Sequence, residues 1–126
     1  MPTAPPSPGT ARALDTFVKL RRVSDGAVVR TFEGHVSQVY AVAFSRDGTK
    51  LATGGSDYTA IIWNVATGTA LHTLSGHDFS IFAVAFSPDG SLLASASGDN
   101  TAKIWNTNTG GLVRTLTGHT FFVSSV

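Results

Sequence analysis

Residues 34–75 and 76–117 carry nearly the same sequence. The first stretch reads GHVSQVYAVAFSRDGTKLATGGSDYTAIIWNVATGTALHTLS, and the second reads GHDFSIFAVAFSPDGSLLASASGDNTAKIWNTNTGGLVRTLT. Aligned without a gap, they are identical at 21 of 42 positions, and most of the other positions exchange similar side chains. An internal repeat of this length indicates an array of supersecondary units, each of which buries its apolar face against its neighbours.

Weaker copies of the pattern flank these two repeats. Residues 118–126 begin again with a Gly-His pair, and we expect them to be the start of a truncated repeat. The sequence RTFEGH at 30–35 matches HTLSGH at 72–77, so residues 15–33 are expected to form a degenerate partial repeat. Residues 1–14 are rich in Pro, Ser, Ala and Thr and are expected to be a flexible tail.

Each full repeat contains four runs of strand-forming residues separated by turn signals. The sequences SRDG at 45–48 and SPDG at 87–90 are typical of type I turns in short hairpin loops. Four antiparallel strands in a unit of about 40 residues form one blade of a β-propeller, so we predict an all-β fold. The predicted strands are 39–44, 50–55, 60–64 and 70–74, and then 81–86, 92–97, 102–106 and 112–116.

The first strand of each repeat departs from simple alternation. Val39 and Val42 are three residues apart, as are Ile81 and Val84, whereas residues on one face of a regular strand are two apart. A β-bulge would let both members of each pair face inward. We therefore expect a bulge in each first strand.

These features together resemble the WD40-repeat family of β-propellers. A repeat of that family runs from Gly-His through an SPDG-like turn and an Asp-x-Thr segment to a strand that ends in Trp-Asp. The resemblance covers roughly residues 15–126 and implies four-stranded antiparallel blades, here too few to close a ring and therefore an open arc. Asn64 and Asn106 stand where the family has its final Asp, a common variation. The matching residues are Gly34, His35, Asp47, Gly48, Asp57, Thr59 and Trp63, and then Gly76, His77, Pro88, Asp89, Gly90, Asp99, Thr101 and Trp105.

The Gly-His pairs allow three interpretations. A shared metal site needs ligand atoms about 2 Å from one ion, which residues one blade apart cannot supply. General acid–base catalysis needs a histidine beside a unique nucleophile or substrate pocket, whereas these surroundings recur in each repeat. The resemblance implies a structural role, in which the His, a Ser or Thr of the second strand, the turn Asp and the Trp form a hydrogen-bonded tetrad. These tetrads would be His35, Thr53, Asp57 and Trp63, and then His77, Ser95, Asp99 and Trp105.

The composition limits the classes of partner. The 126 residues include nine basic and eight acidic side chains, a net charge of +1, which gives no general electrostatic case for binding nucleic acid or an anionic membrane. Lys19, Arg21 and Arg22 form a local basic group, but no aromatic stacking platform accompanies them. There is no cysteine, so disulfides and thiolate metal sites are excluded, and neither a metal nor a cofactor is expected. Since no signal peptide or apolar run of 18 residues is seen, we expect a cytoplasmic or nuclear location.

The leading functional hypothesis is a non-catalytic scaffold that binds other proteins or peptides, as members of the resembled family mostly do. Tyr40 and Phe82 are the strongest candidate contacts, because aromatic side chains anchor interfaces, although both rings could instead pack between blades. A propeller enzyme is the less favoured hypothesis, because the repeat itself accounts for the Asp and His residues. The candidate protein-binding residues are Gln38, Tyr40, Ser56, Phe79, Ser80, Phe82 and Gly98.

The number of repeats raises a separate question, because propeller rings commonly contain four to eight blades. An open arc leaves apolar faces and strand edges exposed. We expect the chain to be a fragment of a larger WD-repeat protein, whose missing sequence supplies further blades. The alternative is that several copies of the chain assemble into a closed ring.

Overall fold

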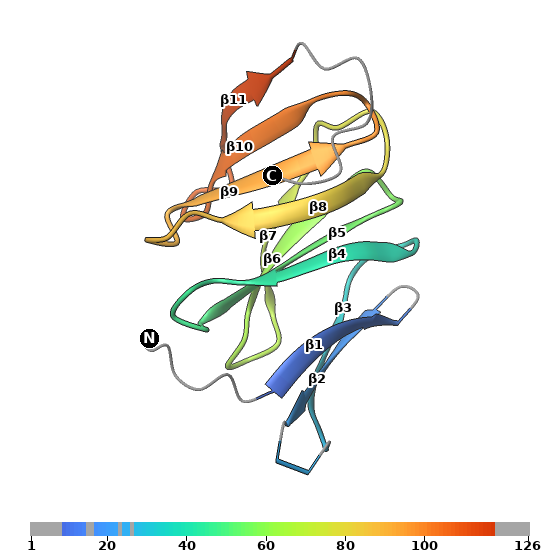
Figure 1. The fold of residues 1–126 in the computed structure, drawn as a ribbon, viewed down its shortest axis with the longest axis vertical. Helices are drawn as coiled ribbons and strands as arrows, with labels where there is room; N and C mark the ends of the chain where they lie inside the picture. The colour runs from blue at the N-terminus through green and yellow to red at the C-terminus, as the bar shows by residue number, and fades with distance from the viewer. Residues whose placement is uncertain (1–8, 15–16, 23, 26, 118–126) are drawn as a thin grey trace.

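The computed structural model describes residues 9–14, 17–22, 24–25 and 27–117. Within these ranges the chain forms eleven β-strands in three sheets, and no helix there is long and apolar enough to cross a membrane (Figure 1). The strands are β1 (Gly9–Leu14), β2 (Phe17–Arg22), β3 (Val28–Glu33), β4 (Val39–Phe44), β5 (Lys50–Gly55), β6 (Ala60–Asn64), β7 (Ala70–Leu74), β8 (Ile81–Phe86), β9 (Leu92–Ser97), β10 (Ala102–Asn106) and β11 (Leu112–Leu116).

Each full repeat forms one four-stranded antiparallel sheet, in which strands adjacent along the chain are also adjacent in the sheet. The orders are β4-β5-β6-β7 and β8-β9-β10-β11, and all eight strands have the bounds predicted from the sequence. The three sheets follow one another in space without closing into a ring (Figure 1). The predicted all-β fold, with four-stranded antiparallel blades in an open arc, is confirmed.

The tight turns between the first two strands are held by aspartate. In the turn from β4 to β5, the Asp47 carboxylate accepts hydrogen bonds from the backbone N–H of Thr49 (3.0 Å) and from the hydroxyls of Thr49 (2.7 Å) and Ser45 (2.8 Å). These bonds lower the pKa of Asp47 to about 2. Gly48 follows with φ at 74°, a left-handed conformation that glycine adopts without strain. The SPDG turn of the second repeat has the same arrangement around Asp89.

The flexible tail expected over residues 1–14 is wrong for its last six residues. Gly9–Leu14 form β1, which pairs antiparallel with β2 from Gly9↔Arg22 to Leu14↔Phe17. The prolines that suggested a tail end at Pro8, so every residue of β1 has a backbone N–H to donate. The first sheet therefore has three strands, in the order β1-β2-β3, and extends beyond the partial repeat expected over residues 15–33.

The predicted β-bulges are present in the first strand of each full repeat. The register between β4 and β5 shifts between Val39 and Ala41, and the register between β8 and β9 shifts at the matching place. Ile81 and Val84 are both buried as a result, and Val39 is buried while Val42 is half-buried against the same cluster. The bulges thus turn both members of each pair toward the interior.

The hydrophobic core lies between the sheets. Because the middle sheet is packed on both faces, the four residues Ala60–Trp63 of β6 are all buried. One cluster joins the first sheet to the second and comprises Val18, Leu20, Phe32, Val39, Leu51, Ile61, Trp63 and Val65. The other joins the second sheet to the third and comprises Ala41, Ala52, Ala60, Ile62, Leu74, Ile81, Val84, Leu93 and Trp105.

The outer face of the third sheet carries the same apolar residues as the covered face of the second. Leu74 is 1% exposed beneath the third sheet, whereas Leu116, at the matching position 42 residues later, is 42% exposed. Three further matched pairs change from buried to half-buried: Ala41 and Ala83, Ala52 and Ala94, and Ile62 and Ile104. We call Ala83, Ala94, Ile104 and Leu116 the open face. Among the described residues, nothing comparable to the third sheet covers it.

Candidate functional site

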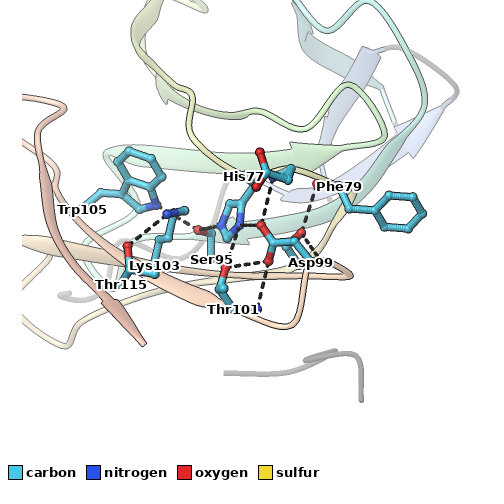
Figure 2. A network of polar contacts seen from close by, with 10 residues as sticks. His77, Phe79, Ser95, Asp99, Thr101, Lys103, Trp105 and Thr115 are labelled. Carbon is cyan, nitrogen blue, oxygen red and sulfur yellow. Dashed lines mark hydrogen bonds and ion pairs between the residues drawn. The ribbon is translucent and has the colours of Figure 1, made fainter. Parts of the chain in front are cut away.

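Four side chains of the second repeat form a continuous chain of hydrogen bonds (Figure 2). His77 Nδ1 lies 2.9 Å from Asp99 Oδ2, and His77 Nε2 lies 2.7 Å from Ser95 Oγ. The indole Nε1–H of Trp105 donates to Ser95 Oγ over 2.9 Å. The first repeat has the same chain, with distances of 2.9, 2.6 and 2.9 Å, through Asp57, His35, Thr53 and Trp63. Both tetrads expected from the sequence therefore lie within hydrogen-bonding distance throughout.

The direction of the hydrogen bonds follows from what each group can donate. An indole N–H can only donate, so Ser95 Oγ accepts from Trp105 and its own proton is left for His77 Nε2. Nδ1 of His77 then carries the ring proton and donates to the Asp99 carboxylate. Burial lowers the pKa of His77 and outweighs the opposing effect of Asp99, which keeps the ring neutral near pH 7. His77 is hydrogen-bonded at both ring nitrogens, so the network holds the imidazole in one orientation.

The aspartate of each tetrad also holds a tight turn. Burial by itself would raise the pKa of Asp99, but hydrogen bonds outweigh it and hold the pKa well below its usual value. The donors are the Thr101 hydroxyl (2.6 Å), the backbone N–H of Asp78 (3.0 Å), His77 and the backbone N–H of Thr101 (2.9 Å). Asp99 therefore fixes both its own turn and the loop that leads to Phe79.

In the first repeat, the turn held by the tetrad aspartate carries an aromatic residue, Tyr58. Asp57 accepts hydrogen bonds from the Thr59 hydroxyl (2.8 Å) and from the backbone N–H of Val36 (3.1 Å). Burial favours a higher pKa, yet these bonds together with the one from His35 lower the pKa of Asp57. Tyr58, between the two turn residues, has φ at 70°, a left-handed conformation uncommon outside glycine. The network holds the turn that places Tyr58 at the surface.

The state of His77 predicts how stability depends on pH. Since the pKa of His77 is lower in the folded protein, the unfolded chain binds a proton first as the pH falls below about 6.5. The contribution of His77 to the free energy of unfolding is complete above that pH. It decreases below that pH, by up to about 1.4 kcal/mol per pH unit. We expect the difference in unfolding free energy between wild type and His77→Gln to shrink from pH 7.5 to pH 5, measured by urea unfolding at fixed ionic strength. A difference that stays constant over this range would contradict the assignment of a neutral ring.

Four aromatic rings from the two full repeats form a row of successive contacts. The rings of Tyr40 and Phe82 stack with centroids 5.5 Å apart and planes at 23°. Phe79 meets Phe82 edge-on at 6.5 Å and lies 5.9 Å from Tyr58. Tyr40, Tyr58 and Phe79 are 46%, 43% and 42% exposed, and Phe82 is half-buried. We call these four residues the aromatic cluster; it spans the seam between the second and third sheets, and Phe79 points away from the His77–Asp99 pair (Figure 2).

The other candidate contact residues lie around this cluster, with one correction. Gln38 is exposed, Ser56 is half-buried, and the Ser56 N–H donates to the Gln38 carbonyl over 2.8 Å. Gly98 lies beneath the cluster, since a Cβ there would collide with the Phe79 ring. Ser80, predicted to be part of the surface, is only 8% exposed. Gln38, at the matching position of the first repeat, accepts the same kind of backbone hydrogen bond and is exposed, so the shorter side chain of Ser80 accounts for its burial.

Tyr58 is the member of the cluster that sequence reasoning missed. It occupies the variable position between the turn Asp and Thr, where the second repeat has Asn100. Asn100 has the same left-handed conformation, with φ at 71°. An aromatic residue at a position that favours asparagine was the available signal. Among the described residues, no three His, Asp or Glu side chains are close enough to share a metal ion.

Comparison with known proteins finds WD repeats at the two full repeats of this chain. The family model described as "WD domain, G-beta repeat" matches residues 26–64 and 68–106. An uncharacterized WD repeat-containing protein of Synechocystis is 47% identical over 58 residues, which are 45% of this chain and 17% of that protein. The THO complex subunit 3 of Arabidopsis thaliana is 50% identical over 36 residues, 29% of this chain and 11% of the relative.

Solved structures extend the match to nearly the whole chain. The structure of U3-55K and the crystal structure of the RRP9 WD40 repeats each have a TM-score of 0.91 and 29% sequence identity with this chain. Each comparison covers 97% of this chain but only 39% of the solved one. The chain thus spans well under half the length of these structures and less than a fifth of the two curated relatives above.

Proposed function

The chain belongs to the WD40 family of G-beta repeats, and on that premise we propose that it is a non-catalytic scaffold that binds other proteins. The aromatic cluster is the observation that carries this proposal. Clustered, partly exposed aromatic side chains are typical anchors of protein interfaces. The cluster also rests on turns held by both tetrads, so it is a rigid surface that loses little conformational freedom on binding. One relative is by its name a subunit of a complex, which agrees with such a role.

The proposed contact surface consists of the aromatic cluster and its immediate neighbours. It comprises Gln38, Tyr40, Ser56, Tyr58, Phe79, Phe82 and Gly98. Ser80 contributes through its backbone, which holds the Gly98 turn. The tetrad histidines and aspartates are proposed to be structural, since their hydrogen bonds are internal and repeat in both sheets. A cytoplasmic or nuclear location agrees with this role.

The open face supports a second part of the proposal, namely that further blades adjoin this chain in the complete protein. Its residues Ala83, Ala94 and Ile104 match Ala41, Ala52 and Ile62, which the third sheet covers. A sheet packed on one side alone leaves apolar area in water, at a cost of about 25 cal/mol per Å². The favoured source of the covering blade is additional sequence of a larger propeller.

The alternative source is another copy of the same chain in a closed ring. A second copy would have to present its first sheet, in which Arg21 stands where the covering sheet has Trp105. That replacement disfavours the copy as the covering blade. Size-exclusion chromatography with light scattering on the 126-residue chain separates the two sources. A discrete ring of several copies would support self-assembly, whereas an ill-defined, concentration-dependent aggregate would support a missing blade.

The scaffold proposal itself is tested by removing the two stacked rings. In the full-length protein, we expect Tyr40→Ala combined with Phe82→Ala to lose partners captured by affinity purification and identified by mass spectrometry. Leu71→Ala, which removes an exposed apolar side chain from β7, is the control and should keep them. The thermal midpoints should confirm that both variants are folded. An identical set of partners for folded wild type and double variant would contradict this surface.

A further inference from the structure

The aromatic cluster lies among carboxylates, and this combination points to the chemistry of its partner. We propose that the cluster binds a cationic protein segment, with a Lys or Arg side chain lying on the exposed ring faces beside Asp78. The inference rests on the proposed scaffold function and deepens it by naming the partner's chemistry. It can fail while the scaffold function stands, because the two are tested by different experiments.

The rings supply the first half of such a site. The faces of tyrosine and phenylalanine carry negative electrostatic potential, which attracts ammonium and guanidinium groups within about 6 Å of the ring centre. The cluster offers a chain of contacts from Tyr40 through Phe82 and Phe79 to Tyr58, with centroid distances of 5.5, 6.5 and 5.9 Å. Three of the four rings are more than 40% exposed. An extended segment can therefore cross the seam between two sheets and remain on aromatic surface.

The charges of the surrounding loops supply the second half. The cluster is surrounded by residues 34–38, 56–59, 76–80 and 98–101, which contain Asp57, Asp78 and Asp99 but no Lys or Arg. Hydrogen bonding lowers the pKa of Asp57 and Asp99, so both remain negative at neutral pH, while burial keeps His77 neutral. This end of the sheets is thus negative although the chain as a whole has a net charge of +1.

The described basic side chains do not neutralise this end. Lys103 lies in the sequence between Asp99 and Trp105, two members of the tetrad. Its ammonium group donates a hydrogen bond to the Thr115 hydroxyl over 3.0 Å. It lies on the Trp105 side of His77, whereas Phe79 lies on the other side (Figure 2). Arg46 and Lys50 belong to the turn at the opposite end of β4 and β5. In the four loop segments around the aromatic surface, which the structure describes, there are carboxylates but no Lys or Arg.

Asp78 is the carboxylate best placed to contact a ligand. It is exposed and immediately precedes Phe79, and its own backbone N–H is fixed by Asp99 over 3.0 Å. Asp57 and Asp99 use their oxygens on internal donors and contribute mainly long-range attraction. The same charges repel phosphate, so the site disfavours RNA and DNA. A Lys- or Arg-bearing protein segment is the occupant that both ring faces and charge favour.

The test compares peptides that differ in a single charge. Fluorescence polarisation on the full-length protein would use labelled Gly-Ala peptides of nine residues with Arg, Lys, norleucine or Glu at the centre. We expect saturable binding of the Arg and Lys peptides and at least ten-fold weaker binding of the norleucine and Glu peptides. We also expect the affinity to fall as salt is raised from 50 to 300 mM, as attraction between charges requires.

Matched variants separate the ring faces from simple hydrophobic contact. Phe79→Leu keeps apolar bulk but removes the ring, and it should weaken the Arg peptide about two- to five-fold without weakening the norleucine peptide. Asp78→Asn should weaken Arg and Lys peptides and flatten the salt dependence. Arg46→Gln, at the far end of the sheets, is the control that should bind as wild type. Methyl proton spectra would establish that each variant is folded.

Three outcomes would overturn the inference. The first is equal binding of the norleucine and Arg peptides. The second is binding of Arg peptides by folded Asp78→Asn and Phe79→Leu as strong as that of wild type. The third is tighter binding of oligouridine than of any peptide. If the Tyr40 and Phe82 double variant still loses its captured partners while the peptides show no preference for positive charge, the scaffold function stands. The cationic partner is then wrong. If neither partners nor peptides respond, both proposals fail together.

Discussion

Replacing Asp99 by Ala is expected to lower the free energy of unfolding of the full-length protein by about 3–5 kcal/mol, because several donors lose their acceptor at about 1–3 kcal/mol each. The carboxylate is the shared acceptor of His77, the Thr101 hydroxyl and two backbone N–H groups. Its removal leaves these donors unpaired in a half-buried turn, and an unpaired buried group costs more than a hydrogen bond gains. The loss should also propagate to Ser95 and Trp105, whose hydrogen bonds depend on the orientation of His77.

The measurement is urea unfolding at pH 7.5, with Asp78→Ala as the matched control. Asp78 is adjacent to the tetrad and carries the same charge, but its carboxylate is exposed. We expect its replacement to change stability by about 0.5 kcal/mol or less. If Asp99→Ala were no more destabilising than Asp78→Ala, the tetrad would not stabilise the blade, and His77 would need a different explanation.

The second large effect concerns the packing of one sheet on the next. Leu74→Ala is expected to cost about 2–5 kcal/mol, because the side chain is fully buried between the second and third sheets. Leu116→Ala removes the same atoms from the matching strand, yet in the 126-residue chain it should cost about 1 kcal/mol or less, because Leu116 lies on the open face. Thermal unfolding of the two variants beside wild type measures both costs.

The same pair of variants tests whether a further blade covers the open face. In a longer protein whose next blade covers the open face, Leu116→Ala should become as costly as Leu74→Ala. Equal and small effects at both positions would mean that the sheets do not pack as described. Equal and large effects in the 126-residue chain alone would mean that something already covers the open face, which would favour assembly of copies.

The sequence predicted the strands of the two full repeats well because several signals agreed at each boundary. The SRDG and SPDG turns, the Asp-x-Thr turns, the Thr-Gly turns and the Gly-His pairs mark the strand ends, and the two copies could be read against each other. β1 was missed because its neighbours Pro5, Pro6 and Pro8 suggested disorder, and because an ungapped shift of 42 residues aligns it one position out of register with β5. Its partner β2 stabilises it through backbone hydrogen bonds, which a composition cannot reveal.

The candidate site was predictable only in part. The tetrad members follow from the repeat. Which group donates in each hydrogen bond, however, depends on the positions of the donors and acceptors in space. The aromatic cluster joins Tyr40 to Phe82, which are 42 residues apart, and so depends on how tightly two sheets pack. Tyr58 reaches Phe79 only because its backbone is left-handed. Ser80 was placed on the surface because it flanks the first strand of its repeat, as the exposed Gln38 does in the other repeat, whereas its short side chain is buried.

Central to all of this is that consecutive repeats lie face to face as adjacent blades, and one nuclear Overhauser measurement tests it directly. Gly54 in β5 has no side chain where Ile81 of β8 approaches, since a Cβ at Gly54 would lie 2.5 Å from Ile81 Cγ2. We predict a strong cross-peak between the Gly54 α-protons and the γ2-methyl of Ile81 in the folded protein. A well-dispersed spectrum that lacks this cross-peak would show that the second and third sheets are not packed together, and would contradict the account.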